Sequence, residues 1–371
     1  MEKNKFILKA LKKRKTEGKY RSLSSSFGLI DFCSNDYLGV AKDRDLHQLV
    51  LNRLTAQNEI DLGSGGSRLL AGNHAFYESL ESEMATLYRA ESSLFFNSGY
   101  TANLSIFSAI PQKKDTILYD EFIHTCVKDG ARLSPAKRLP FKHNDVEDLA
   151  AKLDRIEQGN IYVAIESVYS MDGDFAKVKE IADLCSQKDA YLIVDEAHST
   201  GLYGSSGEGY CVEQGVDKLV WCRVHTFGKA IGVHGACVAG SKELTQYLIN
   251  FARPFIYTTA SSPHHVLTVQ EALNHVKLLQ ERRDELRKKI TLFQSLVNQP
   301  AKSNTPIQVV IIEGNDNVKQ VAKNIQNEGF DVRAILSPTV KEGTERLRIC
   351  LHSFNTDNEI KDLVKLIHQF K

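Results

Sequence analysis

Three polar residues of this sequence lie where catalytic chemistry is plausible. Lys229 lies between glycines in "HTFGKAIGVHG" (225–235), Asp195 ends the apolar run "AYLIVD" (190–195), and His198 follows three residues later. A neutral lysine amine is a nucleophile, and a buried carboxylate pairs well with a cationic ring. Taken separately the signals are weak, because most loop lysines are solvated and most strand-end aspartates and nearby histidines belong to turns or to packing.

A glycine turn that leads into a helix-like segment adds an anion site. "SSLFFNSGYTANLSIF" predicts a strand followed by a helix, which places the amides of Gly99 and Tyr100 at a helix N-terminus. Unpaired amides and the helix dipole favour an anion such as phosphate there. A phosphate cradle, a carboxylate and a lysine amine are together what pyridoxal phosphate requires, since the lysine forms an imine and the carboxylate pairs with the pyridine nitrogen.

An α/β sheet must position these residues, because ligands of open α/β folds bind beyond the carboxyl ends of the strands. Short apolar runs alternate with helix-period segments from about residue 60 to 240, which predicts a parallel sheet covered on both faces. The expected strands are 92–96, 115–119, 161–167, 190–195 and 218–224, and the expected helices are 74–90, 99–110, 145–157 and 176–188.

The remaining sequence predicts a connector and a smaller α/β unit. Residues 269–299 are expected to form one continuous charged helix with i,i+4 charge pairs on its outer face. Strands at 307–313, 330–336 and 345–351 follow, with helices near 317–329 and 357–370. We therefore expect an N-terminal helix and segment over 1–40, a large cofactor-binding domain over 41–265, and the connector with a small C-terminal domain over 266–371.

Composition limits the class of partner. The 371 residues include 47 Lys and Arg against 46 Asp and Glu, so no large charge favours nucleic acid or an anionic membrane. No apolar run approaches the length of a membrane span, and the first 21 residues lack the apolar core of a signal peptide. The seven scattered cysteines form no C-x-x-C pair, which favours a reducing cytoplasm over a disulfide framework or a metal site.

Other nucleotide-type cofactors fit the sequence poorly. A nicotinamide or flavin enzyme needs G-x-G-x-x-G between its first strand and helix, a nucleotide hydrolase needs G-x-x-x-x-G-K-[ST], and neither motif occurs. "GSGGSRLLAGNH" (63–74) is glycine-rich but follows a helix-like segment rather than a strand. We expect it to be a close-approach loop that lines the site.

A family resemblance rests on motifs that occur in one order over nearly the whole chain. They are "FCSNDYLGV" (32–40), "GSGGSRLLAGNH" (63–74), "FFNSGYTAN" (95–103), "DEFIHTCVKDGARLS" (120–134), "ESVYSMDGD" (166–174), "VDEAHSTGLYG" (194–204), "HTFGKAIGVHGA" (225–236), "ARPFIYTT" (252–259) and "SPTVKEGTERLRI" (337–349). The chain thereby resembles the α-oxoamine synthase family of fold-type I pyridoxal phosphate enzymes. The resemblance implies an α/β fold with a large, mostly parallel seven-stranded sheet domain, a small C-terminal α/β domain and a short N-terminal segment.

The resemblance also implies cofactor roles. Lys229 would form the imine and remove the α-proton, Asp195 would keep the ring nitrogen protonated, and His198 would hydrogen-bond the phenolic oxygen. His124 would stack on the ring face. The residues expected to hold the cofactor or to lie close to its ring are Gly99, Tyr100, Ser170 and Thr226.

For the substrates, the family implies a carboxylate site and an acyl site. Asn35 and Arg348 would face the carboxylate of the amino acid, for which a guanidinium fork is well suited. Arg21 and Thr339 resemble positions that contact the acyl substrate. The implied reaction condenses alanine with an acyl thioester, pimeloyl-coenzyme A or a pimeloyl-acyl carrier protein, and releases carbon dioxide, thiol and an α-amino ketone. Alternatives are a glycine- or serine-using branch, a transaminase or aldolase, and a non-catalytic subunit.

Members of the family resemble one another in forming homodimers with the active site at the subunit boundary. "FIYTTASSP" (255–263) lies where the family contributes residues across that boundary. His234 stands where a small residue is usual, and Cys237 follows it. We expect both to be packing residues.

Overall fold

The computed structural model describes residues 2–23, 28–57, 60–297 and 303–371. The chain divides into two compact units. Unit 1 comprises Met1–Ser34, Met171–Gly173 and Leu286–Lys371, and unit 2 comprises Asn35–Ser170 and Asp174–Glu285. The domain bounds expected from the sequence, 1–40, 41–265 and 266–371, stay a prediction beside this division.

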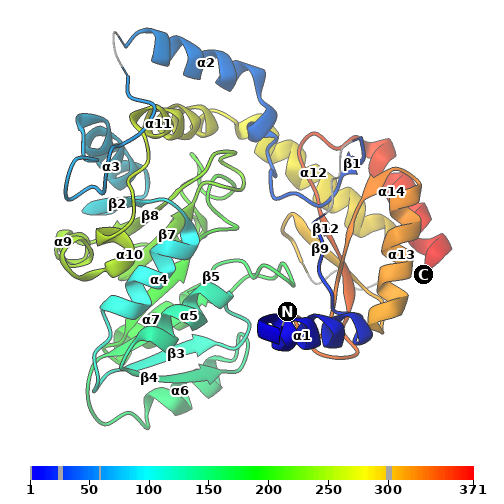
Figure 1. The fold of residues 1–371 in the computed structure, drawn as a ribbon, viewed down its shortest axis with the longest axis horizontal. Coiled ribbons are helices and arrows are strands. Elements are labelled where there is room, and N and C mark those ends of the chain that lie inside the picture. Colours follow the sequence, from blue (N-terminus) through cyan, green and yellow to red (C-terminus); the bar gives the residue numbers. More distant parts are fainter. Residues whose placement is uncertain (1, 24–27, 58–59, 298–302) are drawn as a thin grey trace. The chain divides into compact units, whose positions relative to one another are not determined.

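Unit 2 is built on a seven-stranded sheet with the strand order β2-β8-β7-β6-β5-β3-β4 (Figure 1). The strands are β2 (Ser92–Phe96), β3 (Thr116–Asp120), β4 (Lys137–Phe141), β5 (Ile161–Glu166), β6 (Tyr191–Asp195), β7 (Cys222–Thr226) and β8 (Ala236–Gly240). β8 is antiparallel to both of its neighbours, and the pairs from β7 through β4 are parallel. The expected mostly parallel seven-stranded sheet is confirmed.

Alternate residues of each strand pack on opposite faces of this sheet. Ala164, Ile193 and Val224 belong to one core cluster, whereas Val163 and Val194 belong to another. The first cluster is completed by α4 (Gly99–Ala109), α5 (Thr125–Leu133), α9 (Lys242–Phe251) and α10 (Arg253–Ile256). The second is completed by α6 (Val146–Leu153), α7 (Val178–Gln187) and α8 (Tyr210–Glu213). The position of a strand's last residue in this alternation therefore determines the face of the sheet on which its side chain lies.

A further group of helices completes unit 2. It contains η2 (Val40–Lys42), α2 (Arg44–Thr55), α3 (Ala75–Leu87) and α11 (Pro263–Lys277), and α11 contacts both α2 and α3. Asp43 caps α2 by accepting hydrogen bonds from the amides of Asp45 and Leu46 at 2.8 and 3.0 Å.

The single helix expected over 269–299 is wrong, because the structure has two helices there. α11 ends at Lys277 and α12 (Gln280–Leu296) begins three residues later, while residues 298–299 lie outside the described ranges. The buried Arg283 side chain donates to the carbonyl oxygens of Val276 at 2.9 Å and Lys277 at 3.3 Å. These bonds satisfy carbonyls at the end of α11 that a continuous helix would have used internally.

Unit 1 contains a three-stranded antiparallel sheet of order β11 (Arg333–Ile335), β12 (Arg346–Cys350) and β9 (Ile307–Ile311). The helices α13 (Asn315–Asn327) and α14 (Asp357–Phe370) pack on each other, and α13 also contacts β11 and β12. The strand expected at 330–336 is divided, because its first residues form β10 (Phe330–Asp331), which pairs with β1 (Ile30–Asp31).

The N-terminal end of unit 1 comprises η1 (Glu2–Asn4) and α1 (Lys5–Thr16). None of the residues of α1 is buried, and its lysines remain at the surface. Among the helices that the structure describes, none combines the length and the apolar character that crossing a membrane demands.

Candidate active site

Three neighbouring strands of unit 2 end in polar residues on one face of the sheet. Glu166, Asp195 and Thr226 are the last residues of β5, β6 and β7, and Glu166 pairs with Asp195 in the sheet register. The residue two positions before each of them belongs to the core cluster that contains α4. Because side chains alternate between the two faces of a strand, all three side chains lie on the α4 face of the sheet. The carboxyl edge of the sheet thus gathers two carboxyls and a hydroxyl, where α/β folds bind ligands.

Asp195 is buried and its carboxylate is oriented by two donors. Asn103 Nδ2, from α4, donates to Oδ2 at 2.7 Å, and the amide of Ala197 donates to Oδ1 at 2.9 Å. Analysis of the sequence missed Asn103. Its signal was its place one helical turn after Gly99, on the side of α4 that faces the sheet.

Lys229 lies in the tight connection between β7 and β8. The amide of Phe227 donates to the Gly235 carbonyl at 2.9 Å, the amide of Val233 to the Phe227 carbonyl at 3.0 Å, and that of Gly232 to the Lys229 carbonyl at 2.9 Å. These bonds hold the half-buried lysine directly beyond the carboxyl end of β7.

The charge of Lys229 reaches two other groups of the site. Its ammonium acts to lower the pKa of both Glu166 and His124, and the Asp195 carboxylate acts to raise both. The structure therefore brings together the lysine, the aspartate and His124, which the sequence predicted as one site.

His198 is buried and belongs to a short hydrogen-bonded chain. Its Nδ1 lies 2.8 Å from the hydroxyl oxygen of Tyr37, and that hydroxyl donates to Asn35 Oδ1 at 3.1 Å. Because a tyrosine hydroxyl has one proton, donation to Asn35 leaves its oxygen to accept from His198 Nδ1. The sequence analysis missed Tyr37, although it stands in the same "SNDYLG" motif as Asn35.

His124 caps α5, and its ring is held in a defined tautomer. The amide of Cys126 donates to Nδ1 at 3.3 Å, so the ring proton belongs on Nε2. Desolvation lowers the pKa of His124, and together with the Lys229 ammonium it outweighs the opposing effect of Asp195. A neutral imidazole on an exposed residue results, which suits stacking on an aromatic ring.

The start of α4 forms a cradle for an anion. Ser98 caps the helix in a capping box with Thr101, which leaves the amides of Gly99 and Tyr100 in the first turn, ahead of the intrahelical bonds. A Cβ on Gly99 would lie 2.4 Å from Thr226 Cγ2. Only glycine permits this approach, which places Thr226 beside the helix N-terminus.

Glu166 is a second carboxyl of the site that the sequence analysis missed. Its Oε2 accepts a hydrogen bond from the amide of Ser170 at 3.3 Å. Burial and the neighbouring Asp195 carboxylate raise the pKa of Glu166 to about 8. The available signal was its position at the end of a strand adjacent to that of Asp195.

Three of the expected substrate residues belong to unit 1. Arg21 is exposed beyond α1, and Thr339 is exposed in a turn in which its amide donates to the Leu336 carbonyl at 2.9 Å. Arg348 lies in β12, with Nη1 at 3.0 Å from Cys350 Sγ. The substrate roles of these residues and of Asn35, which lies in unit 2, stay predictions.

The two residues expected to be packing residues differ. Cys237 is fully buried in β8, which confirms the expectation. The expectation for His234 is wrong, because its side chain is exposed. Its carbonyl lies 2.9 Å from His265 Nε2, and the two ring centres are 6.2 Å apart.

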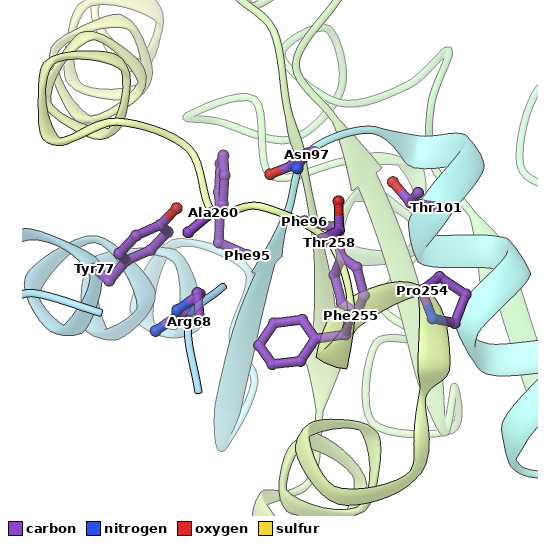
Figure 2. A pocket seen from close by; sticks show the side chains of 10 residues that line it. All are labelled: Arg68, Tyr77, Phe95, Phe96, Asn97, Thr101, Pro254, Phe255, Thr258 and Ala260. Atoms are coloured by element: carbon purple, nitrogen blue, oxygen red, sulfur yellow. The ribbon is translucent and has the colours of Figure 1, made fainter. Parts of the chain in front are cut away.

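A small pocket lies beside the start of α4 (Figure 2). It is lined by Arg68, Tyr77, Phe95, Phe96, Asn97, Thr101, Pro254, Phe255, Thr258 and Ala260. The Arg68 guanidinium lies 3.9 Å from the centre of the Tyr77 ring, and the amide of Ala260 donates to the Gly66 carbonyl at 2.9 Å. The loop 63–74 therefore packs on the segment 255–263, and this pocket contains none of the residues expected to bind the cofactor.

Within the described ranges, no group of three or more histidine, cysteine, aspartate or glutamate side chains has an arrangement that could hold a metal ion.

Comparison with known proteins adds family evidence to this geometry. The model of the family "aminotransferase class I and II" matches residues 28–367. The 8-amino-7-oxononanoate synthase of Emericella nidulans is 39% identical over 91% of this chain and 88% of its own. The putative 8-amino-7-oxononanoate synthase of Bacillus licheniformis is 36% identical over 99% and 96%.

Solved structures give the same assignment of fold. Serine palmitoyltransferase from S. paucimobilis, in a structure with bound pyridoxal phosphate and myriocin, has a TM-score of 0.88 at 24% identity and covers 99% of this chain and 97% of its own. The 8-amino-7-oxononanoate synthase from Francisella tularensis has a TM-score of 0.78 at 28% identity, over 92% and 97%. With the motifs and the site geometry, these findings show that the chain belongs to the aminotransferase class I and II family, in its α-oxoamine synthase branch.

Proposed function

We propose that this chain is a pyridoxal phosphate-dependent 8-amino-7-oxononanoate synthase. It condenses L-alanine with a pimeloyl thioester and releases carbon dioxide, thiol and 8-amino-7-oxononanoate, a step of biotin biosynthesis. The observation that carries the proposal is the convergence of the Lys229 loop, the Asp195 carboxylate and the Gly99 helix start at one edge of the sheet. The curated relatives, at 34–39% identity, supply the identity of the substrates.

The residues of this edge fit pyridoxal phosphate. The absence of a Cβ at Gly99 opens the helix start beside Thr226, where a phosphate would accept from the amides of Gly99 and Tyr100. Asp195 presents an acceptor-only carboxylate for a protonated pyridine nitrogen, and Lys229 presents an amine for the aldehyde. When bound, the cofactor supplies an electron sink for the negative charge that develops on the α-carbon of the amino acid.

The protein side chains then hold and move protons. Lys229 Nζ would anchor the cofactor and, once displaced by the amino acid, would take the α-proton as a neutral amine. Asp195 would retain the proton on the ring nitrogen. His198, oriented through Nδ1 by Tyr37, would offer Nε2 to the phenolic oxygen, and the neutral ring of His124 would cover the cofactor face.

The substrate groups follow the family. Asn35 and Arg348 would bind the carboxylate of alanine, and Arg21 and Thr339 would contact the acyl chain or its carrier, either coenzyme A or an acyl carrier protein. The alternative within the family is a glycine C-acetyltransferase-like or serine palmitoyltransferase-like enzyme, and product analysis distinguishes the three.

We also infer a homodimer in the cytoplasm. Support for the dimer comes from large apolar side chains that are exposed on the two segments expected at the subunit boundary. Leu70 in the loop 63–74 is 84% exposed, and Tyr257 in 255–263 is 75% exposed. The scattered cysteines fit a reducing compartment.

The test is product identification with purified protein. The protein, loaded with pyridoxal phosphate, is mixed with alanine, glycine or serine and with acyl thioesters of several chain lengths on coenzyme A and on acyl carrier protein. We expect 8-amino-7-oxononanoate by mass from alanine and the pimeloyl thioester, and a yellow colour that borohydride bleaches. Lys229→Ala is the control and should give neither. Thiol release with glycine or serine but not with alanine would contradict the proposal.

A further inference from the structure

We infer that Glu166 is a second carboxyl of the active site which stays protonated and positions Ser170, rather than acting as an anion beside Asp195. The inference rests on the proposed function for its link to the cofactor. It adds a positioning residue to which the family motifs assigned no role.

The first argument is the sheet register. Glu166 and Asp195 are paired neighbours at the ends of parallel strands, and their side chains share one face. They are buried to 3% and 6% exposure. Two carboxylates so placed cannot both be ionised without strong repulsion, so one of them keeps a proton.

The second argument concerns which of the two carboxyls keeps the proton. Both oxygens of Asp195 accept a hydrogen bond, from Asn103 and from the Ala197 amide. Oε2 of Glu166 accepts from the Ser170 amide, and its buried Oε1 has no hydrogen-bond partner among the residues that the structure describes. A buried anion with an unpaired oxygen costs much more than a neutral carboxylic acid in the same place, although the O–H on Oε1 would also lack a partner among the described residues.

The charged and titratable groups around Glu166 come from four elements. They are Asp195 at the end of β6, Lys229 beyond β7, His124, Cys126 and Lys128 at and in α5, and Tyr169 beyond β5. Burial and Asp195 raise the pKa of Glu166 to about 8, although the Lys229 ammonium opposes the rise. The geometric argument and the charge environment therefore agree.

A protonated Glu166 has two consequences for the site. Its carbonyl oxygen holds the backbone of Ser170, a residue expected close to the cofactor ring. Its neutrality leaves Asp195 as the sole anion of this carboxyl pair, so the ring nitrogen would pair with Asp195 alone.

The experiment compares wild type with Glu166→Gln, which keeps a neutral side chain with one acceptor oxygen, and Glu166→Leu, which keeps neither. Glu157→Gln, at an exposed position, is the control for loss of an ordinary carboxylate. Melting temperatures are measured from pH 5 to pH 9 on the protein without added cofactor, and pyridoxal phosphate affinity is measured by titration of the same samples.

The sign of the pH effect follows from linkage. The unfolded chain loses the Glu166 proton near pH 4.5 and the folded protein near pH 8, so wild type loses stability relative to Glu166→Gln across that interval and no further above it. The melting temperature of Glu166→Gln relative to wild type should therefore rise from pH 5 to pH 8 and then level off. Glu157→Gln should show no such trend.

Cofactor affinity gives the second readout. Glu166→Gln should bind pyridoxal phosphate within about threefold of wild type, and Glu166→Leu about tenfold more weakly, because the Ser170 hydrogen bond is lost. A melting difference that does not change with pH, together with a Glu166→Gln affinity as weak as that of Glu166→Leu, would overturn the inference. Wild type that binds no pyridoxal phosphate would instead overturn the proposed function, and the melting comparison would still decide the protonation of Glu166.

Discussion

Asp195 and Asp120 each end a strand of the same sheet, β6 and β3, yet their surroundings differ. Asp120 accepts hydrogen bonds from His143 Nδ1 at 2.9 Å and from the amides of Phe122 at 2.9 Å and Asn144 at 3.0 Å. In the alternation along β3, its side chain lies on the face of the sheet that packs on α6 and α7, whereas the side chain of Asp195 lies on the opposite face. A strand-end aspartate is therefore not by itself a sign of catalysis, since Asp120 is held in the fold by a histidine and two backbone amides on the other face of the sheet.

The partner of Asp120 makes this contrast clear. His143 contacts Asp120 through Nδ1 and Asp174 through Nε2, the latter at 2.8 Å, so both of its ring nitrogens donate. Burial opposes a charge on this ring, but the two carboxylates outweigh it and raise the pKa of His143 to about 10. The result is an ion-paired clamp between chain segments, whereas the donors to Asp195 among the described residues, Asn103 Nδ2 and the Ala197 amide, are neutral.

The strongest test of the contrast exchanges each aspartate for its amide. Asp195→Asn should lower turnover on the order of 100- to 10 000-fold, because an amide does not hold the ring nitrogen proton, and should leave the melting temperature near that of wild type. Asp120→Asn is the matched variant and should lose about 2 kcal/mol of stability while its turnover is retained. Steady-state kinetics and urea unfolding of both variants measure these effects. Equal losses of turnover in the two variants would contradict the difference between the two aspartates.

His143→Gln tests the structural side of the comparison. At pH 7 it should lower the free energy of unfolding by about 2–3 kcal/mol, since two charge-assisted hydrogen bonds are lost. The folded pKa lies above the ordinary 6.5, so this stabilisation is fully present below pH 6.5 and is lost as the pH rises through about 10. Urea unfolding at pH 6, 8 and 10 measures it, and a deficit of the same size at pH 6 and pH 10 would contradict the assignment.

Tyr37→Phe tests a partner of the site. Loss of the hydroxyl should lower turnover about tenfold, the effect of one hydrogen bond of about 1.4 kcal/mol, because His198 would lose the group that orients it. The pH dependence of the absorbance of the bound cofactor should shift as well. Tyr88→Phe is the matched control, since its buried hydroxyl has no hydrogen-bond partner among the described residues. Identical pH profiles for wild type and Tyr37→Phe would argue against the role.

The smallest expected effect concerns the helix start. Ser98→Ala removes an N-cap and should cost about 1 kcal/mol of stability, and it should also weaken pyridoxal phosphate binding several-fold by loosening the amides of Gly99 and Tyr100. Ser241→Ala removes the cap of α9, where Leu244 N donates to Ser241 Oγ at 3.1 Å. That control should show the same loss of stability with unchanged cofactor affinity. If both variants weaken cofactor binding equally, the effect belongs to general stability.

Much of the large sheet could be predicted because its buried parallel strands are continuous apolar runs. β4 was missed because "KRLPF" is polar and contains a proline, which an edge strand tolerates. β8 was missed because "ACVAG" reads as a glycine-rich loop, although small residues suit a strand packed between two others. The break between α11 and α12 depends on Arg283, whose contacts no local periodicity reveals.

For the site as well, residues with a local sequence signal were predicted and residues defined by tertiary contacts were missed. Lys229, Asp195 and the Gly99 turn were predicted since each follows directly from a strand or helix boundary in the sequence. Asn103 and Glu166 were missed because their importance comes from contacts made between elements, through α4 and through the pairing of β5 with β6.

The antiparallel pairing of β7 with β8 makes Lys229 the tip residue of a β-hairpin rather than part of a mobile surface loop. Backbone hydrogen bonds from Phe227 and Val233 extend the hairpin beyond the strands, to within one residue of the glycine that precedes the lysine. The amine of Lys229 can therefore swing through the torsions of its own four-carbon side chain while its α-carbon stays fixed. Exchange of the amine between its cofactor-bound and proton-carrying states would then need no remodelling of the chain, and the conformational entropy that the step involves is that of one side chain.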